Sequence, residues 1–265
     1  MKVRGERECR ECGTRWSYYE TGSVACPSCE SLRSVGVDER TAHTDAPATL
    51  DVSRYRSRFG EARGTLPEEG VDDLKGELRG FLRTRGFIRG GELLPLDRTY
   101  LAARELLEVV DAYDRLVEPT DDDREYLLAL LAGVEDGDRP GVAAVPDSLR
   151  DARGAAAARA VGEYRDDLLA FLDELDGFEH TDGDGAEAPT VTVEGPDPAG
   201  RVAPARETLE RLRDRTKRVE ALQGDVDPAV ADALVAAVSA VGEYVRTGET
   251  EALATARARI GDAEL

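Results

Sequence analysis

Several residue types are scarce in this sequence. Asparagine is absent, glutamine and tryptophan each occur once, isoleucine occurs twice, and only 5% of the 265 residues are aromatic. A hydrophobic core must therefore consist mostly of leucine, valine and alanine, which is typical of packed helices. No apolar run approaches the ~20 residues of a membrane-spanning helix. The start, MKVRGERECRE, has no apolar segment of a signal peptide. These absences predict a cytoplasmic protein without a membrane partner.

Acidic residues are in large excess. The chain has 55 acidic and 35 basic side chains, which gives a formal net charge of −20. A GC-rich genome explains the preference for arginine over lysine, but it does not explain the surplus of acids. A surplus of surface carboxylates keeps proteins soluble in molar salt, so the composition indicates a halophile that accumulates salt. A disordered acidic chain is the alternative. The 41% of apolar residues and the helical periodicity argue against it.

All four cysteines lie near the N-terminus, in two Cys-x-x-Cys pairs separated by 13 residues. In a reducing cytoplasm such pairs favour a metal over disulfides. Zn²⁺ takes four tetrahedral ligands, and four thiolates leave no position open for a substrate. The spacing therefore predicts one structural Zn²⁺ and no catalytic metal. The predicted ligands are Cys9, Cys12, Cys26 and Cys29.

Residues 1–37 are predicted to form a small β module around this metal. Residues 14–19 and 31–37 favour strands, with a turn between them. A module of this size buries too little apolar surface to fold alone, so metal binding must stabilise it. We expect Trp16 and Tyr18, which alternate along a strand, to form its small core together with the metal.

The stretch ECRECGTRWSYYETGSVACPSCESLRSVGV resembles a zinc ribbon of the TFIIB type, which is related to rubredoxin-like knuckles. The whole chain resembles functionally uncharacterised haloarchaeal proteins in which such a ribbon precedes an acidic helical region. The resemblance implies that the four cysteines are metal ligands, and it suggests partners related to transcription. Glu30 stands where many knuckles have glycine after the second pair.

The rest of the chain predicts a mainly α protein, with the β zinc ribbon followed by an α-helical bundle or hairpins. Residues 38–66 are mixed and polar and predict a linker, and residues 67–265 form the helical region. Five glycines and three prolines predict a disordered loop at 177–201. Apolar residues at 3-and-4 spacing and capping signals predict helices at 67–86, 97–117, from 120 onward, 147–175, 203–222, 228–247 and 249–262.

The stretch SRYRSRFGEAR allows two interpretations. Arg54, Arg56 and Arg58 alternate with Tyr55 and Phe59, so arginines could pair with phosphates while aromatic rings stack on bases. Alternatively, arginine is the solubilising cation and the aromatic rings anchor the segment to the helices. We favour the second interpretation, because high salt weakens attraction to phosphate.

No motif nominates an enzyme. The sequence contains no P-loop, no glycine fingerprint after a strand and no His-Glu-x-x-His. His43 and His180 have no nucleophile or metal partner nearby in sequence. We therefore expect a non-enzymatic protein that binds a protein or a nucleic acid. Two alternatives remain open: a rubredoxin-like iron electron carrier, and a helical enzyme with an accessory ribbon.

Overall fold

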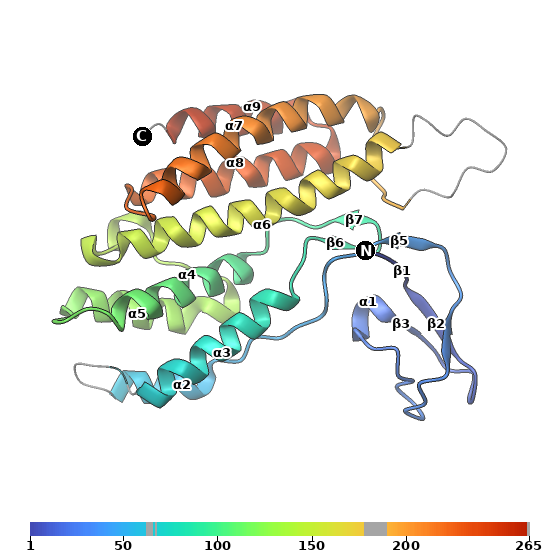
Figure 1. The fold of residues 1–265 in the computed structure, drawn as a ribbon, viewed down its shortest axis with the longest axis horizontal. Coiled ribbons are helices and arrows are strands. Elements are labelled where there is room, and N and C mark those ends of the chain that lie inside the picture. The colour runs from blue at the N-terminus through green and yellow to red at the C-terminus, as the bar shows by residue number, and fades with distance from the viewer. Residues whose placement is uncertain (62–65, 67, 178–189, 264–265) are drawn as a thin grey trace.

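The computed structural model describes residues 1–61, 66, 68–177 and 190–263. In these ranges the chain is mainly α-helical, with a small β region at the N-terminus (Figure 1). The predicted fold class is therefore confirmed. Below, residues 1–37 are called the ribbon, and the helices from α2 to α9 are called the helical body.

The ribbon contains a three-stranded antiparallel sheet in the order β3-β2-β4. Strand β2 runs over Glu6–Cys9, and it pairs with β3, Arg15–Ser17, and with β4, Ser34–Gly36. Strand β1, Lys2–Arg4, pairs instead with β5, Arg40–Ala42. The pairing of β1 with β5 brings the two ends of the ribbon together at its base.

The predicted helices are present, with boundaries within a few residues of those expected. Helix α2 is additional and lies inside the predicted linker. A one-turn helix, α1 at Tyr18–Thr21, follows β3. Strands β6, Ile88–Arg89, and β7, Glu92–Leu93, form a hairpin with a two-residue turn. The longer helices are α2 Ser53–Glu61, α3 Glu68–Thr84, α4 Arg98–Tyr113, α5 Asp121–Gly133, α6 Arg150–Asp176, α7 Val202–Ala221, α8 Pro228–Thr247 and α9 Thr250–Asp262.

Side chains fix the starts of three helices as predicted. The Asp97 carboxylate accepts a hydrogen bond from the Thr99 backbone N–H at the start of α4. Thr120 and Asp123 form a reciprocal capping box at the start of α5. Asp227 caps α8, whose first residue is a proline. Such caps satisfy N–H groups that have no partner inside the helix.

Helix α6 lies at the centre of the helical body. It packs against α4 on one side and against α7 and α8 on the other, and α9 completes the layer on that second side (Figure 1). Helices α5, α3 and α2 extend the layer around α4. The bundle therefore has one continuous core, whose buried residues come from every helix from α2 to α9.

Helix α8 is long and apolar enough, by length and composition, to cross a membrane. In the structure, 56% of its most apolar window is buried against neighbouring helices. The core helix of a soluble bundle can have the same composition, because much of its surface meets other helices. The apolar character of α8 is explained by this packing.

The structure differs from the predicted linker at residues 38–66. This segment contains β5 and α2, and Val52, Tyr55 and Phe59 are at most 1% exposed. The prediction rested on local polarity and on turn-forming residues. Burial here depends instead on packing against α3, the next helix, and against α5, which lies about 60 residues further along the chain. Residues 38–61 are thus a packed part of the protein.

The predicted loop at 177–201 falls largely on residues 178–189, which lie outside the described ranges. Among the described residues, Val191 is 3% exposed, and Thr192 forms a parallel bridge with Glu92. Arg201 is buried and donates hydrogen bonds to the carbonyls of Val245 and Arg246 at the end of α8. The segment 190–201 is therefore anchored on the body at Val191 and Arg201, while most residues between them are exposed. Local composition did not indicate these anchors.

Candidate metal centre

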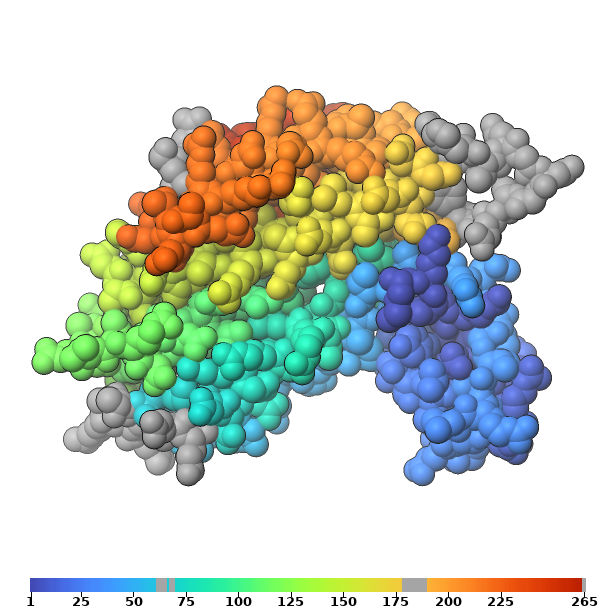
Figure 2. All heavy atoms as spheres, in the orientation of Figure 1, coloured from blue at the N-terminus to red at the C-terminus, as the bar shows by residue number. Residues whose placement is uncertain are grey.

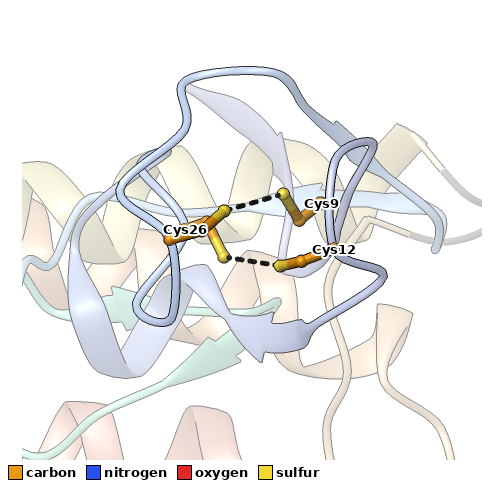
Figure 3. A group of neighbouring side chains, drawn as sticks. Cys9, Cys12 and Cys26 are labelled. Atoms are coloured by element: carbon orange, nitrogen blue, oxygen red, sulfur yellow. Dashed lines mark hydrogen bonds between the residues drawn. The ribbon is translucent and has the colours of Figure 1, made fainter.

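The four cysteines converge from two loops. Cys9 ends β2 and Cys12 follows in the next turn, whereas Cys26 and Cys29 lie in the loop between α1 and β4. The Sγ atoms of Cys9 and Cys29 are 3.7 Å apart, those of Cys12 and Cys26 are 3.5 Å apart, and all four lie within 4.8 Å of one another (Figure 3). A tetrahedral ion with metal–sulfur bonds of ~2.3 Å places its sulfurs ~3.8 Å apart. The sulfurs thus have the spacing of a metal site.

The two loops have the same hydrogen-bond pattern. The backbone N–H of Glu11 donates to Cys9 Sγ, and that of Ser28 donates to Cys26 Sγ, both at 3.4 Å. One residue after each pair, the chain turns back. The N–H of Gly13 donates to the Cys9 carbonyl at 3.0 Å, and that of Glu30 donates to the Cys26 carbonyl at 2.9 Å. N–H donors aimed at sulfur favour the thiolate, which is the form that binds a metal.

Glu30 occupies the position that glycine occupies in the first loop. Gly13 has a φ of 73° and Glu30 has a φ of 59°. A side chain in this left-handed region costs roughly 1–2 kcal/mol, which glycine avoids. The second loop therefore keeps the geometry of the first despite a less suitable residue, and the departure noted in the sequence does not displace Cys26 or Cys29.

The cysteine thiols do not ionise alike. Hydrogen bonds with Thr14, from its side chain and then its backbone, lower the pKa of Cys12 to about 6. At Cys29, a backbone hydrogen bond with Ser31 lowers the pKa, but the neighbouring Cys12 sulfur and burial outweigh it and raise the pKa to about 12. Negative charges this close together oppose one another, so the cluster retains protons unless a cation is bound. This donor set suits a thiophilic dication.

The ribbon has a small core of its own. Cys9, Cys26 and Trp16 are buried together, and the Trp16 indole N–H donates to the Ser23 carbonyl at 3.0 Å. Tyr18 is not part of this cluster, so that prediction was wrong. Strand β3 ends at Ser17, and Tyr18 begins α1, where its ring lies 5.9 Å from the His43 ring.

His43 lies at the junction between the ribbon and the helical body. It is 2% exposed, and its ring is 4.8 Å from that of Tyr19. Burial lowers the pKa of His43, which favours the neutral ring. Next to it, the Asp45 carboxylate accepts hydrogen bonds from Arg89 and from the Gly86 N–H. Sequence reasoning missed both roles, because Tyr19 lies 24 residues from His43 and the partners of Asp45 lie more than 40 residues from it.

The arginine segment 54–58 is engaged with the body. Arg54 pairs with Glu77, and Arg56 pairs with Glu135, each at 2.7 Å. Arg58 also has an interaction partner. Tyr55 and Phe59 are buried and cannot stack on bases. These contacts agree with the interpretation that the aromatic rings anchor the segment.

A family model described as "Family of unknown function (DUF7117)" matches residues 1–260, so the chain belongs to that family. Searches of curated proteins and of solved structures returned no match. The family match runs through both the ribbon and the helical body. The two parts therefore belong to one family architecture.

We predict that Cys12→Ser loses the metal and unfolds the ribbon but preserves the helical body, because the helices have a separate core. Trp16 is the only tryptophan, so its fluorescence reports on the ribbon alone. Its emission should shift to longer wavelength, while the circular dichroism at 222 nm stays nearly unchanged. Chelation of the wild-type protein should give the same result. Loss of the helical signal would show that the two parts do not fold separately.

We also predict that exchanging the residues after the two cysteine pairs has opposite effects. Glu30→Gly should tighten metal binding by about 1 kcal/mol, or roughly fivefold, because it removes left-handed strain. Gly13→Glu should weaken binding by a similar factor, although nothing lies within 4 Å of an added Cβ there. Competition with a chromophoric chelator measures both affinities. If both substitutions changed the metal affinity in the same direction, backbone strain would not be the cause.

Proposed function

We propose that this member of the DUF7117 family holds one structural Zn²⁺ in its ribbon, and that the ribbon is a recognition module for a partner protein in the cytoplasm. The four sulfurs enclose a site without an open coordination position, so the ion serves folding and not catalysis. The proposal includes no enzymatic reaction. It agrees with the sequence, in which no catalytic motif was found.

The observation that carries the proposal is an exposed apolar surface on the ribbon. Leu32 is 74% exposed and Val24 is 45% exposed. The backbones of both residues are linked through Ser34, whose hydroxyl donates to the Val24 carbonyl at 2.6 Å and whose N–H donates to the Leu32 carbonyl at 3.0 Å. Contact with a partner protein would remove this exposed apolar surface from water, which is favourable.

The shape of the molecule supports this assignment. In Figure 2 the ribbon forms a separate lobe beside the helical body, with an open notch between them. A partner can therefore approach the ribbon without displacing a helix. The net charge of −20 disfavours a long polyanion as the partner, and so favours protein over nucleic acid. The resemblance to TFIIB-type ribbons makes components of the transcription machinery the first candidates.

Metal analysis tests the identity of the ion. We predict one zinc per chain, no iron, and a colourless protein after purification without added metal. Cys12→Ser should contain at most a small fraction of that zinc. Stoichiometric iron with visible charge-transfer absorption would instead support the rubredoxin-like alternative, because the same four sulfurs also suit iron.

A pull-down from native high-salt extract tests the recognition role. We predict that the wild-type protein retains a specific partner, and that Leu32→Ser reduces its recovery at least about fivefold, as expected for an apolar contact of ~1 kcal/mol or more. Leu222→Ser is the matched control, because Leu222 is 50% exposed but lies at the end of α7. Nuclease treatment should leave recovery unchanged. Equal recovery with Leu32→Ser, or loss after nuclease, would overturn the proposal of a protein partner.

A further inference from the structure

A pocket of about 530 Å³ lies in the helical body, away from the cysteines. It is an open pocket, lined by the end of α3, the adjoining turn, α4, α6 and residue Thr44. Four arginines contribute to its lining: Arg79, Arg83, Arg85 and Arg104. Three of them, Arg79, Arg83 and Arg85, lie on α3 or directly after it, in a chain whose overall charge is −20. The pocket therefore gathers guanidinium groups within a chain that is acidic as a whole.

Two of these arginines form ion pairs with carboxylates of the protein. Arg85 pairs with Asp97 at 2.8 Å and with Asp45 at 3.2 Å. Arg104 pairs with Glu163 at 2.6 Å. The Nε atoms of both arginines are nevertheless buried without a hydrogen-bond acceptor among the described residues. Their positions are therefore fixed, and their hydrogen-bonding capacity is not fully used.

The other two arginines have donors to spare. Arg79 is 57% exposed at its side chain, and its pairing with Asp111 is long, at 3.7 Å. Arg83 is exposed and forms no ion pair within the part of the chain that the structure describes. The two residues are four apart on α3, so they lie on the same face of that helix. Their guanidinium groups can serve one ligand together.

The carboxylates of the pocket have other partners. Asp167 accepts hydrogen bonds from the Thr44 hydroxyl and from the Phe87 backbone N–H, both at 2.6 Å. Glu163 pairs with Arg104, whereas Asp166 is 79% exposed at its side chain and contacts its neighbour Arg165 at 3.5 Å. Arg79 and Arg83 are therefore left for a ligand beside one weakly paired carboxylate, a balance that favours an anion.

We propose that this pocket binds the phosphate group of a small organic phosphate. Planar guanidinium groups bind phosphate oxygens in pairs, which gives both strength and orientation. The volume lies within the range of small-molecule sites. Leu82 and Phe87 also line the pocket, but each is at most 5% exposed, so the apolar contacts for the organic part of the ligand come mainly from the arginine stems.

A small ligand fits the pocket better than a nucleic acid does. The acidic surface repels a long polyanion along its whole length, whereas a single phosphate responds mainly to the nearby arginines. Screening at high salt strengthens this difference, because the Debye length at 1 M is only ~3 Å and contact pairs are screened least. This inference concerns the helical body and does not depend on the metal or on the partner of the ribbon.

Calorimetric titration of the full-length, metal-loaded protein tests the proposal, with inorganic phosphate and AMP as probes. We expect one saturable site for each probe, tighter binding of AMP, and competition between the two. Arg79→Gln with Arg83→Gln should weaken both affinities at least about tenfold, as for the loss of charge-assisted hydrogen bonds. Lys217→Gln with Arg218→Gln is the control, because it removes the same charge from exposed positions on α7.

Unchanged circular dichroism and melting of both double variants will show that they fold. Binding of AMP that phosphate does not displace would overturn the proposal, because the phosphate group would not be the recognised part. Equal affinities in the pocket variant and its control, or absence of binding to either probe, would also overturn it. Binding of single-stranded RNA without binding of AMP would reject the small ligand in favour of a nucleic acid.

Discussion

The close packing of helix α6 on several sides is the constraint on which the rest of the structure depends. A helix can have neighbours so close only where its side chains are small, and Ala156, Ala157 and Ala160 on α6 are fully buried. At Gly154 the approach is closer still, because an added Cβ would lie 2.1 Å from the Gly224 carbonyl oxygen. These small side chains let the neighbouring helices approach α6 closely. The few aromatic residues, such as Tyr164 and Phe171 on the same helix, are also buried in the core.

The same helix must also satisfy the polar groups that it buries. Arg153 on α6 is 2% exposed, and it donates to Glu105 on α4 and to Asp232 on α8. A buried charge is tolerated only when it is paired and hydrogen-bonded, so these contacts fix how the layers align. Toward its C-terminal end, α6 uses carboxylates in a similar way. The Asp167 carboxylate accepts a hydrogen bond from the Thr44 hydroxyl, and Glu174 forms an ion pair with Lys2 at 2.9 Å. The base of the ribbon is thus held by the central helix.

The sequence was most informative where the determinants are local. Cap residues such as Asp97 and Thr120 act within a few residues of themselves, so the starts of helices could be predicted. The spacing of the cysteines likewise predicted that two loops form one metal site, and the structure brings the four sulfurs together. Prediction was weaker at residues 38–61, where Tyr55 and Phe59 are core residues although arginines surround them. Their burial depends on helices placed by the tertiary fold.

Asp45 shows the same limit for a polar residue. In the sequence it is one acid among 55. In the structure its side chain is fully buried between Arg85 and Arg89. No local pattern distinguishes it from a surface carboxylate, because both partners lie about forty positions further along the chain. The arginine pocket was missed for the same reason, since Arg104 and Glu163 complete it from other helices.

The way in which the ribbon is attached determines how far the effect of the metal reaches. The β1–β5 pairing closes the chain at the base of the ribbon, so residues 5–39 form an excursion whose two ends are already held together. The base is bonded to the body independently of the sulfurs, since the Ala42 N–H donates to the Thr190 carbonyl and the Gly91 N–H donates to the Ala42 carbonyl. A segment with few contacts beyond its base can open as a local unit while the remainder stays folded. A metal bound by the four sulfurs would thus act on the order of the ribbon, whereas the stability of the helical body rests on its own core.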